Sequence, residues 1–131
     1  MNKRINYASG APWESIVGYS RAVRVGNVVE ITGTVASRDG NVVGPDSMYE
    51  QARYALEKIG GVLSEAGGTF SDVVRTRMFV TDISRWEEVA RAHSEVFGTI
   101  RPCTTLVEVS ALIAPEYLIE IEATAYLSHS D

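Results

Sequence analysis

Residues that carry metal and thiol chemistry are scarce in this chain. Its 131 residues include one cysteine, Cys103, and two histidines, His93 and His129, far apart in the sequence. A single cysteine cannot form an internal disulfide, and isolated histidines lack the spacing of a metal site. The sequence therefore argues against zinc binding and redox chemistry.

Long apolar runs and clusters of basic residues are also missing. No run of about 18 apolar residues is present that would span a membrane, and segment 1–14 lacks the apolar stretch of a signal peptide. Seventeen Asp and Glu against twelve Lys and Arg give a net charge of −5, with no basic run to follow a phosphate backbone. We therefore expect a cytoplasmic protein that binds neither membranes nor nucleic acid.

The remaining composition, 45% hydrophobic and 22% charged, is typical of one globular domain over residues 1–131. Apolar and β-branched patterns predict a strand near Ile5, a hairpin over 19–25 and 28–36 that turns at Gly26-Asn27, a strand over 71–81, and two strands within 101–127. Residues 8–18 and 38–46 are predicted to be loops. Helices separate the later strands, so the order is β-β-β-α-β-α-β-β.

Both helices begin with a capping-box pattern. Ser47 with Glu50 and Ser84 with Glu87 are spaced for reciprocal side-chain and backbone bonds at a first turn. Each helix then carries one apolar stripe at helical spacing, namely Tyr49, Ala52, Leu56, Ile59, Leu63 and Ala66 in the first and Trp86, Val89, Ala90, His93, Val96 and Phe97 in the second. The pair Gly60-Gly61 predicts close packing of the first helix against the sheet.

Strand alternation divides the sheet into two faces. On the last strand an aliphatic set is expected to meet the helices, namely Ile119, Ile121, Ala123, Ala125 and Leu127. With both helices on that face, the opposite face is left uncovered and carries Glu30, Thr32, Thr34, Arg75, Arg77, Glu120 and Glu122. In the strand over 71–81, alternation assigns Val73 to this second face and Val74 to the first. This face is too apolar to be fully exposed to solvent and too charged to be the core of a monomer, so we expect it to be buried between subunits.

Glu120 and Glu122 are carboxylates in an otherwise apolar strand. Each either pairs with Arg75 or Arg77 as a structural ion pair, or serves a cleft with a pKa that burial raises. Tyr19, after Gly18 at a strand start, is either a phenol at a cleft edge or a half-buried aromatic.

Other reactive or aromatic side chains favour structural interpretations. Cys103 follows Pro102 with no histidine nearby in sequence, which predicts a buried, inert thiol. His93 lies in the helical stripe and is expected to pack. Trp13 and Trp86 are expected to be packing or interface residues.

Several motifs together resemble the Rid/YjgF family of reactive intermediate deaminases. They are GYSRAVRVGN, EQARYALEKIGGVLSEAG, VVRTRMFVTDI, and above all VEVSAL followed by IEIEATA. The resemblance implies an α+β, chorismate-mutase-like domain with about six strands and two helices on one face, assembled as a homotrimer with ligand clefts between subunits. It also implies hydrolysis of small 2-imino or enamine acids to 2-keto acids and ammonia, without a metal or organic cofactor.

The family's site residues carry over in part. Tyr19 matches the family tyrosine and Glu120 matches the first glutamate of IEIEA. The carboxylate-binding arginine is replaced by Thr104, and the cysteine before VEV is replaced by Leu106. Cys103 occupies a different position and does not inherit that role.

A neutral threonine cannot hold a carboxylate in the bidentate way of an arginine. We therefore expect a substrate different from the archetypal imino acids, bound partly by backbone groups around Thr105 and Leu106. Arg101, three residues before Thr104, either reaches the same cleft or pairs with a surface acid.

Three functions are compatible with these residues. The first is an imine or enamine hydrolase in which Glu120 is the general base and Tyr19 bonds the ligand. The second is a non-catalytic trimer that binds or senses a metabolite. The third is RNA cleavage, known among relatives and disfavoured here by the acidic charge.

Overall fold

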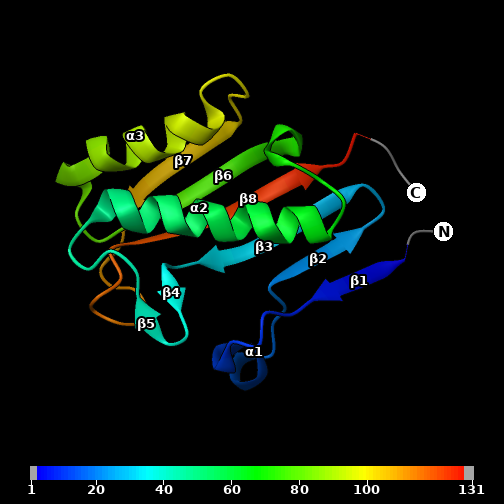
Figure 1. Ribbon diagram of the computed structural model, residues 1–131, viewed down its shortest axis with the longest axis horizontal. Helices are drawn as coiled ribbons and strands as arrows, with labels where there is room; N and C mark the ends of the chain where they lie inside the picture. Colours follow the sequence, from blue (N-terminus) through cyan, green and yellow to red (C-terminus); the bar gives the residue numbers. More distant parts are fainter. Residues whose placement is uncertain (1–2, 129–131) are drawn as a thin grey trace.

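A six-stranded sheet organises the fold (Figure 1), in a computed structural model that describes residues 3–128. The sheet order is β1-β2-β3-β8-β6-β7. Its strands are β1 (Arg4–Tyr7), β2 (Ala22–Val25), β3 (Val28–Thr34), β6 (Val73–Val80), β7 (Cys103–Glu108) and β8 (Ile119–Tyr126). All neighbours are antiparallel except β6 and β7, which are parallel. The predicted mixed α+β sheet is confirmed, while His129 lies outside the described residues.

Two helices, α2 (Met48–Glu65) and α3 (Trp86–Phe97), cover one face of the sheet (Figure 1). The core lies between these layers, and all five aliphatic residues predicted from β8 are buried in it. Burial of such side chains stabilises the fold by roughly 1.5–3 kcal/mol each. Within residues 3–128, no helix combines the length and apolar character needed to cross a bilayer.

The two helices begin in different ways. Ser47 Oγ accepts a hydrogen bond from Glu50 N at 3.1 Å, so the predicted start of α2 is confirmed. The predicted Ser84 cap is wrong. A 3₁₀ turn, η2 (Ile83–Arg85), precedes α3, and Asp82 Oδ1 caps it by accepting from Ser84 N at 3.0 Å. An acidic cap two residues earlier satisfies the first free N–H groups.

The predicted stripe of α3 is correct at Val89 and Phe97 and wrong at Trp86 and Ala90. Val89 and Phe97 are buried, but Trp86 is 51% exposed and Ala90 is exposed, while Ala92 is buried. The buried face of α3 therefore includes Ala92 in place of Ala90.

Two predicted loops contain regular structure. Residues Pro12–Val17 form a short helix, α1, which Gly18 ends at φ 88°. Strands β4 (Ser37–Arg38) and β5 (Asn41–Val42) form a small hairpin apart from the main sheet. Elements of six and two residues are too short to show a helical or alternating period.

The glycine pair of α2 makes a different contact from the one predicted. A Cβ at Gly60 would lie 2.7 Å from Cζ of Phe70, whereas a Cβ at Gly61 would meet open space. Phe70 belongs to the 3₁₀ turn η1 (Phe70–Asp72) and packs edge-to-face on Phe97. Gly60 therefore admits this aromatic pair beside the helix, rather than bringing the helix onto the sheet.

Two bulges change the predicted faces. Pairing of β6 with β8 shifts between Val73 and Arg75, so Val73 is buried and Val74 is 42% exposed, the reverse of simple alternation. Pairing of β3 with β8 shifts between Ile31 and Thr34, so Thr34 is buried opposite Ile121 and leaves the uncovered face. An inserted residue reverses the alternation on one side of a bulge, which a fixed period of two cannot anticipate.

Candidate functional site

Glu120 lies on the uncovered face of β8, half-buried, opposite Phe79 of β6. Its carboxylate lies directly over Gly33 of β3, where an added Cβ would be 2.2 Å from Oε2. Within residues 3–128, no side chain or backbone group makes a hydrogen bond or an ion pair with this carboxylate. Its oxygens are therefore free for a water molecule or a ligand.

Burial raises the pKa of Glu120, and the nearby charge of Glu122 raises it further. The positive charge of Arg21 acts in the opposite direction. A carboxylate with a raised pKa is a stronger base once it is ionised, which suits the removal of a proton from water.

Glu122 has a different environment. Its Oε1 lies 3.3 Å from Nη1 of Arg77, in a pair whose two side chains are both partly exposed. The ion-pair interpretation is thus confirmed for Glu122 with Arg77, whereas Arg75 reaches the hydroxyl of Thr105 at 3.5 Å. Solvent screening keeps such a pair weak, at about 0–1 kcal/mol.

Tyr19 lies two residues after α1, and its backbone N–H donates to the Glu14 carbonyl at 3.0 Å. Its half-buried ring lies 6.0 Å from the guanidinium carbon of Arg21. The same guanidinium donates from Nη1 to the Gly33 carbonyl at 3.2 Å. One arginine therefore contacts both the Tyr19 ring and the strand segment beneath Glu120.

Sequence reasoning missed Arg21, although one signal was present. The signal is an arginine in segment 19–25, which is otherwise rich in apolar residues. Arg21 lies just before β2 and is 8% exposed, and a buried cation needs partners. Its partners come from α1 and from the β3 bulge, neither of which the sequence pattern predicted.

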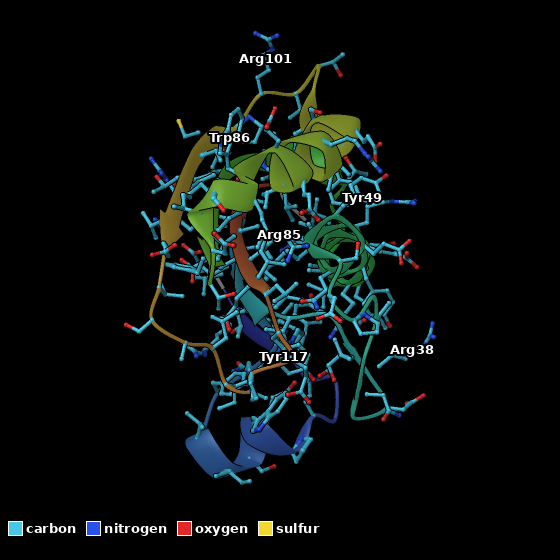
Figure 2. The ribbon with its side chains drawn as sticks, turned by 90° about the vertical axis from the view of Figure 1, so that its left-hand side faces the viewer. Arg38, Tyr49, Arg85, Trp86, Arg101 and Tyr117 are labelled. Carbon is cyan, nitrogen blue, oxygen red and sulfur yellow. The ribbon has the colours of Figure 1, made fainter. Side chains whose placement is uncertain are left out.

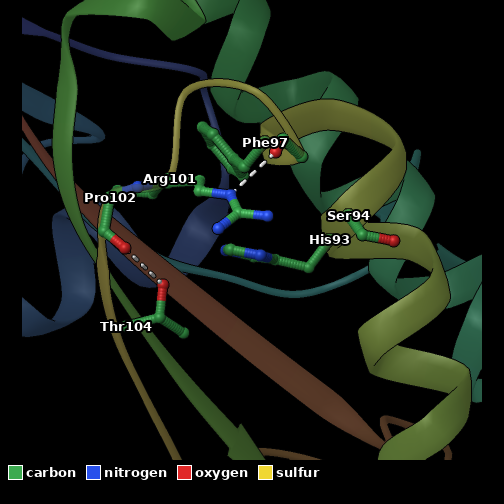
Figure 3. A pocket seen from close by; sticks show the side chains of 7 residues that line it. His93, Ser94, Phe97, Arg101, Pro102 and Thr104 are labelled. Carbon is green, nitrogen blue, oxygen red and sulfur yellow. Dashed lines mark hydrogen bonds between the residues drawn. The ribbon is translucent and has the colours of Figure 1, made fainter.

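A second group of polar residues surrounds the start of β7 (Figure 3). Thr104 Oγ1 lies 2.8 Å from Thr76 Oγ1, which lies 2.9 Å from His93 Nε2. Arg101 lies beside them, with its Nε donating to the Gly98 carbonyl at 3.2 Å. Together they border a hollow of about 300 Å³ lined by His93, Ser94, Phe97, Gly98, Arg101, Pro102 and Thr104.

His93 is a packing residue, as predicted, and also part of this hydrogen-bonded chain. Its ring lies 4.7 Å from the ring of Phe97. Burial lowers the pKa of His93, so the imidazole is neutral near pH 7.

The prediction for Cys103 is wrong, because its side chain is exposed. β7 is an edge strand, and its register with β6 places Cys103 beside Arg75 and Thr105 beside Arg77, on the uncovered face. Leu106, at the family's cysteine position, lies beside Met78 and is half-buried. An edge strand has a neighbour on one side only, so fewer of its side chains are covered.

The two polar groups do not meet within one chain. Glu120 pairs across the sheet with Phe79, which pairs with Val107, three residues from Thr104. Thr104 also points to the helix face, because it pairs with Thr76, whereas Glu120 points to the uncovered face. Arg101 lies at the opposite end of the molecule from α1 (Figure 2).

In the described part of the chain, no three His, Cys, Asp or Glu residues come close enough to hold a metal ion together. The candidate site groups are therefore the carboxylate over Gly33, the hydroxyls of Thr76 and Thr104 beside His93, and the exposed guanidinium of Arg101.

Comparison with known proteins gives one consistent result. The family model described as Endoribonuclease L-PSP matches residues 9–127. Rv2704 of Mycobacterium tuberculosis, whose structure is described as a member of the YjgF/YER057c/UK114 family, is 52% identical with a TM-score of 0.88, over 95% of this chain and 100% of that one. A protein of Streptomyces coelicolor is 36% identical over 90% of this chain and 88% of its own length. The 3-aminoacrylate deaminase RutC of Acinetobacter baylyi is 31% identical over 97% and 100%.

Proposed function

The chain belongs to the YjgF/Rid family, and from this premise we propose that it hydrolyses a small, reactive imine or enamine, with Glu120 as the general base. The observation that carries the proposal is the half-buried Glu120 carboxylate over Gly33, free of hydrogen bonds and ion pairs among the described residues. A buried carboxylate without a partner is costly to the fold, and a catalytic role accounts for it.

The reaction needs no group beyond water and this carboxylate. Glu120 accepts a proton from water as the oxygen attacks the carbon of the protonated C=N bond, which gives a neutral carbinolamine. The proton then passes from Glu120 to the nitrogen, and the carbinolamine hydroxyl gives its own proton to the carboxylate as the C–N bond breaks, so that ammonia and a carbonyl compound leave. An enamine enters the same route after protonation at carbon to give the imine. The Tyr19 hydroxyl is proposed to bond the ligand.

Substrate choice is proposed to differ from that of the archetypal 2-imino acids. Thr104 replaces the carboxylate-binding arginine, and its hydroxyl is engaged with Thr76. Loss of a charge-assisted anchor costs about 1.5–3 kcal/mol in binding. Arg101 borders the same hollow as Thr104 and is proposed as the replacement cation. The name of the Acinetobacter baylyi relative, 3-aminoacrylate deaminase, suggests an enamine acid as the first substrate to test.

A homotrimer is proposed to complete the site. Glu120 and Thr104 face opposite sides of one sheet, so a ligand that contacts both needs the Thr104 side of a second copy. The uncovered face, with Phe79 and the Glu122–Arg77 pair, offers the surface for that contact. Light scattering is expected to give about three times the chain mass of 14.3 kDa, and a monomer would contradict the assembly.

The activity test generates imines in place with an amino-acid oxidase or a threonine dehydratase and measures the release of ammonia. Wild type is expected to exceed Glu120→Gln by about 10²–10⁴-fold, the usual contribution of a general base. Glu65→Gln is the matched control, since it removes an exposed carboxylate of α2, on the helix-covered side of the sheet, and is expected to stay near wild type. Equal rates for wild type and Glu120→Gln would refute the base.

The pH profile gives a second measure. Because the pKa of Glu120 is raised, activity is expected to fall on the acid side at a higher pH than for an ordinary glutamate. A profile that stays flat down to the ordinary range of a glutamate would exclude Glu120 as the group that titrates.

A non-catalytic metabolite-binding trimer is the second candidate, and the neutral, internally bonded Thr104 is the observation that favours it. Stoichiometric binding of an enamine or keto acid that is recovered unchanged would support it. RNA cleavage, which the matching family model's description suggests, is disfavoured by the net charge of −5. Cleavage of RNA by wild type but not by Glu120→Gln would instead support RNA cleavage as the function.

A further inference from the structure

Arg21 is an almost fully buried cation next to the proposed base. It is 8% exposed, and its Nη1 donates to Thr34 Oγ1 at 2.9 Å and to the Gly33 carbonyl at 3.2 Å. Its Nε lies 3.7 Å from Glu14 Oε2 and is buried without a hydrogen-bond partner. Removing a cation from water is expensive, so this arrangement calls for an explanation beyond packing.

The contacts of Arg21 fall on the irregular part of β3. The bulge lies between Ile31 and Thr34, where the regular pairing with β8 is interrupted. Arg21 bonds two groups within it, and Thr34 Oγ1 in turn donates to the Thr32 carbonyl at 2.8 Å. A guanidinium with several donors in one plane can hold such a turn of backbone in a single geometry.

Gly33, whose carbonyl accepts the hydrogen bond from Arg21, also packs directly against the Glu120 side chain. The Cα of Gly33 has Glu120 so close that an added Cβ would be 3.1 Å or less from three atoms of its side chain. A small movement of the bulge would therefore move the Glu120 carboxylate.

The charges near Glu120 give Arg21 a second effect. Glu122, two residues along β8, opposes ionisation of Glu120, and Arg21, the residue before β2, favours it. Glu14 of α1 and Lys58 of α2 interact electrostatically with Arg21, while Arg77 of β6 is paired with Glu122. Arg21 is the nearby cation that acts on Glu120 directly among the described residues.

We propose that Arg21 is the positioning residue of the Glu120 base: it fixes the Gly33 bulge beneath the carboxylate and supplies a positive charge near it. The role in catalysis rests on the proposed function, whereas the effect on Glu120 itself does not. Because Arg21 is buried, it acts through Gly33, Thr34 and the local field, without touching the substrate.

The test follows the ionisation of Glu120 by carbon NMR of its labelled carboxyl group, assigned with Glu120→Gln. In Arg21→Gln the midpoint of the Glu120 titration is expected to move to higher pH. In Arg21→Lys it is expected to lie between wild type and Arg21→Gln, because lysine keeps the charge and loses the planar set of donors. Arg24→Gln, in β2 three residues after Arg21 and bonded to the Gly26 and Ala66 carbonyls, is the matched control and is expected to leave the midpoint of the Glu120 titration unchanged.

Activity adds a separate measurement. On the acid side of the pH profile, kcat/KM of Arg21→Gln is expected to fall on the order of tenfold relative to wild type, the factor that corresponds to one pKa unit. Near the alkaline plateau the loss is expected to be smaller, which a general loss of structure would not produce.

A Glu120 midpoint that is the same in wild type, Arg21→Lys and Arg21→Gln would overturn the inference. If Arg21→Gln does not fold, Arg21→Lys is compared with wild type instead. An unchanged midpoint of the Glu120 titration, or an unchanged acid side of the pH–activity profile, would contradict a role for the planar donors of the guanidinium. If wild type shows no deaminase activity, the proposed function fails, and the NMR titration still judges Arg21.

Discussion

Alanine at Gly33 is predicted to impair the proposed activity with little effect on stability. A Cβ built there lies 2.2 Å from Glu120 Oε2 and 2.8 Å from Cδ, both below the closest distances of real contacts. The carboxylate must retreat by roughly 1 Å to restore ordinary contact. Since its backbone φ lies outside the left-handed region, the alanine itself is accommodated without backbone strain.

The expected magnitudes differ between catalysis and folding. A displacement of 1 Å in a catalytic group can lower the rate on the order of 10²-fold, so kcat/KM of Gly33→Ala should fall by about that factor. The side-chain distortion costs about 0.5–1.5 kcal/mol, while replacing a strand glycine returns about 0.5–1 kcal/mol. The free energy of unfolding is therefore expected to stay within about 1 kcal/mol of wild type.

The assay pairs ammonia release from imines generated in place with urea unfolding monitored by circular dichroism. Gly61→Ala is the control, because a Cβ there meets open space on α2; it should gain about 1 kcal/mol in stability and keep full activity. Wild-type kcat/KM in Gly33→Ala would refute the reasoning that the Gly33 surface determines where the Glu120 carboxylate lies.

Three further predictions concern stability. Burial lowers the pKa of His93, so as pH falls the histidine is protonated in the unfolded chain before it is protonated in the folded one, and wild type should lose stability below about pH 6.5. Urea unfolding at pH 7.5 and 5.5 should show a smaller loss for His93→Gln, and equal losses in the two proteins would contradict this prediction. The hydrogen bond from Arg85 lowers the pKa of Glu88, so Glu88→Gln should lower the free energy of unfolding by about 0.5–1 kcal/mol at neutral pH. This difference from wild type should vanish as pH falls through the folded-state pKa of Glu88, and a difference that persists at low pH would exclude the ion pair as its cause. Gly60→Ala should lower stability by about 1–2 kcal/mol despite its better helix propensity, because its Cβ would lie 2.7 Å from the Phe70 ring, and a rise in the thermal midpoint would contradict this.

The sequence determined the class of fold because the main elements are long and strongly patterned. α2 carries a stripe over eighteen residues and begins at its predicted Ser47 cap. β8 alternates without interruption, so Ile119 to Ala125 divide into faces as predicted and leave Glu120 on the uncovered side. Local pattern suffices where burial repeats with the period of the element itself.

The tertiary structure decided which of two similar glutamates is free. Glu120 and Glu122 have the same alternation and nearly the same neighbours in sequence. Strand register places Arg77 opposite Glu122 and Phe79 opposite Glu120, so only Glu122 has an ion-pair partner across that pairing. Register depends on how distant strands pair, and no local period encodes it.

Bulges and the edge strand decided the rest of the site. The bulge in β3 buries Thr34 and offers Gly33 to both Arg21 and Glu120. The edge position of β7 exposes Cys103, which the sequence alone predicted to be buried. The local sequence therefore determines which residue types are available for a site. The partners that determine their charge and position come from contacts between strands far apart in the chain, because burial and electrostatic fields depend on distance in space.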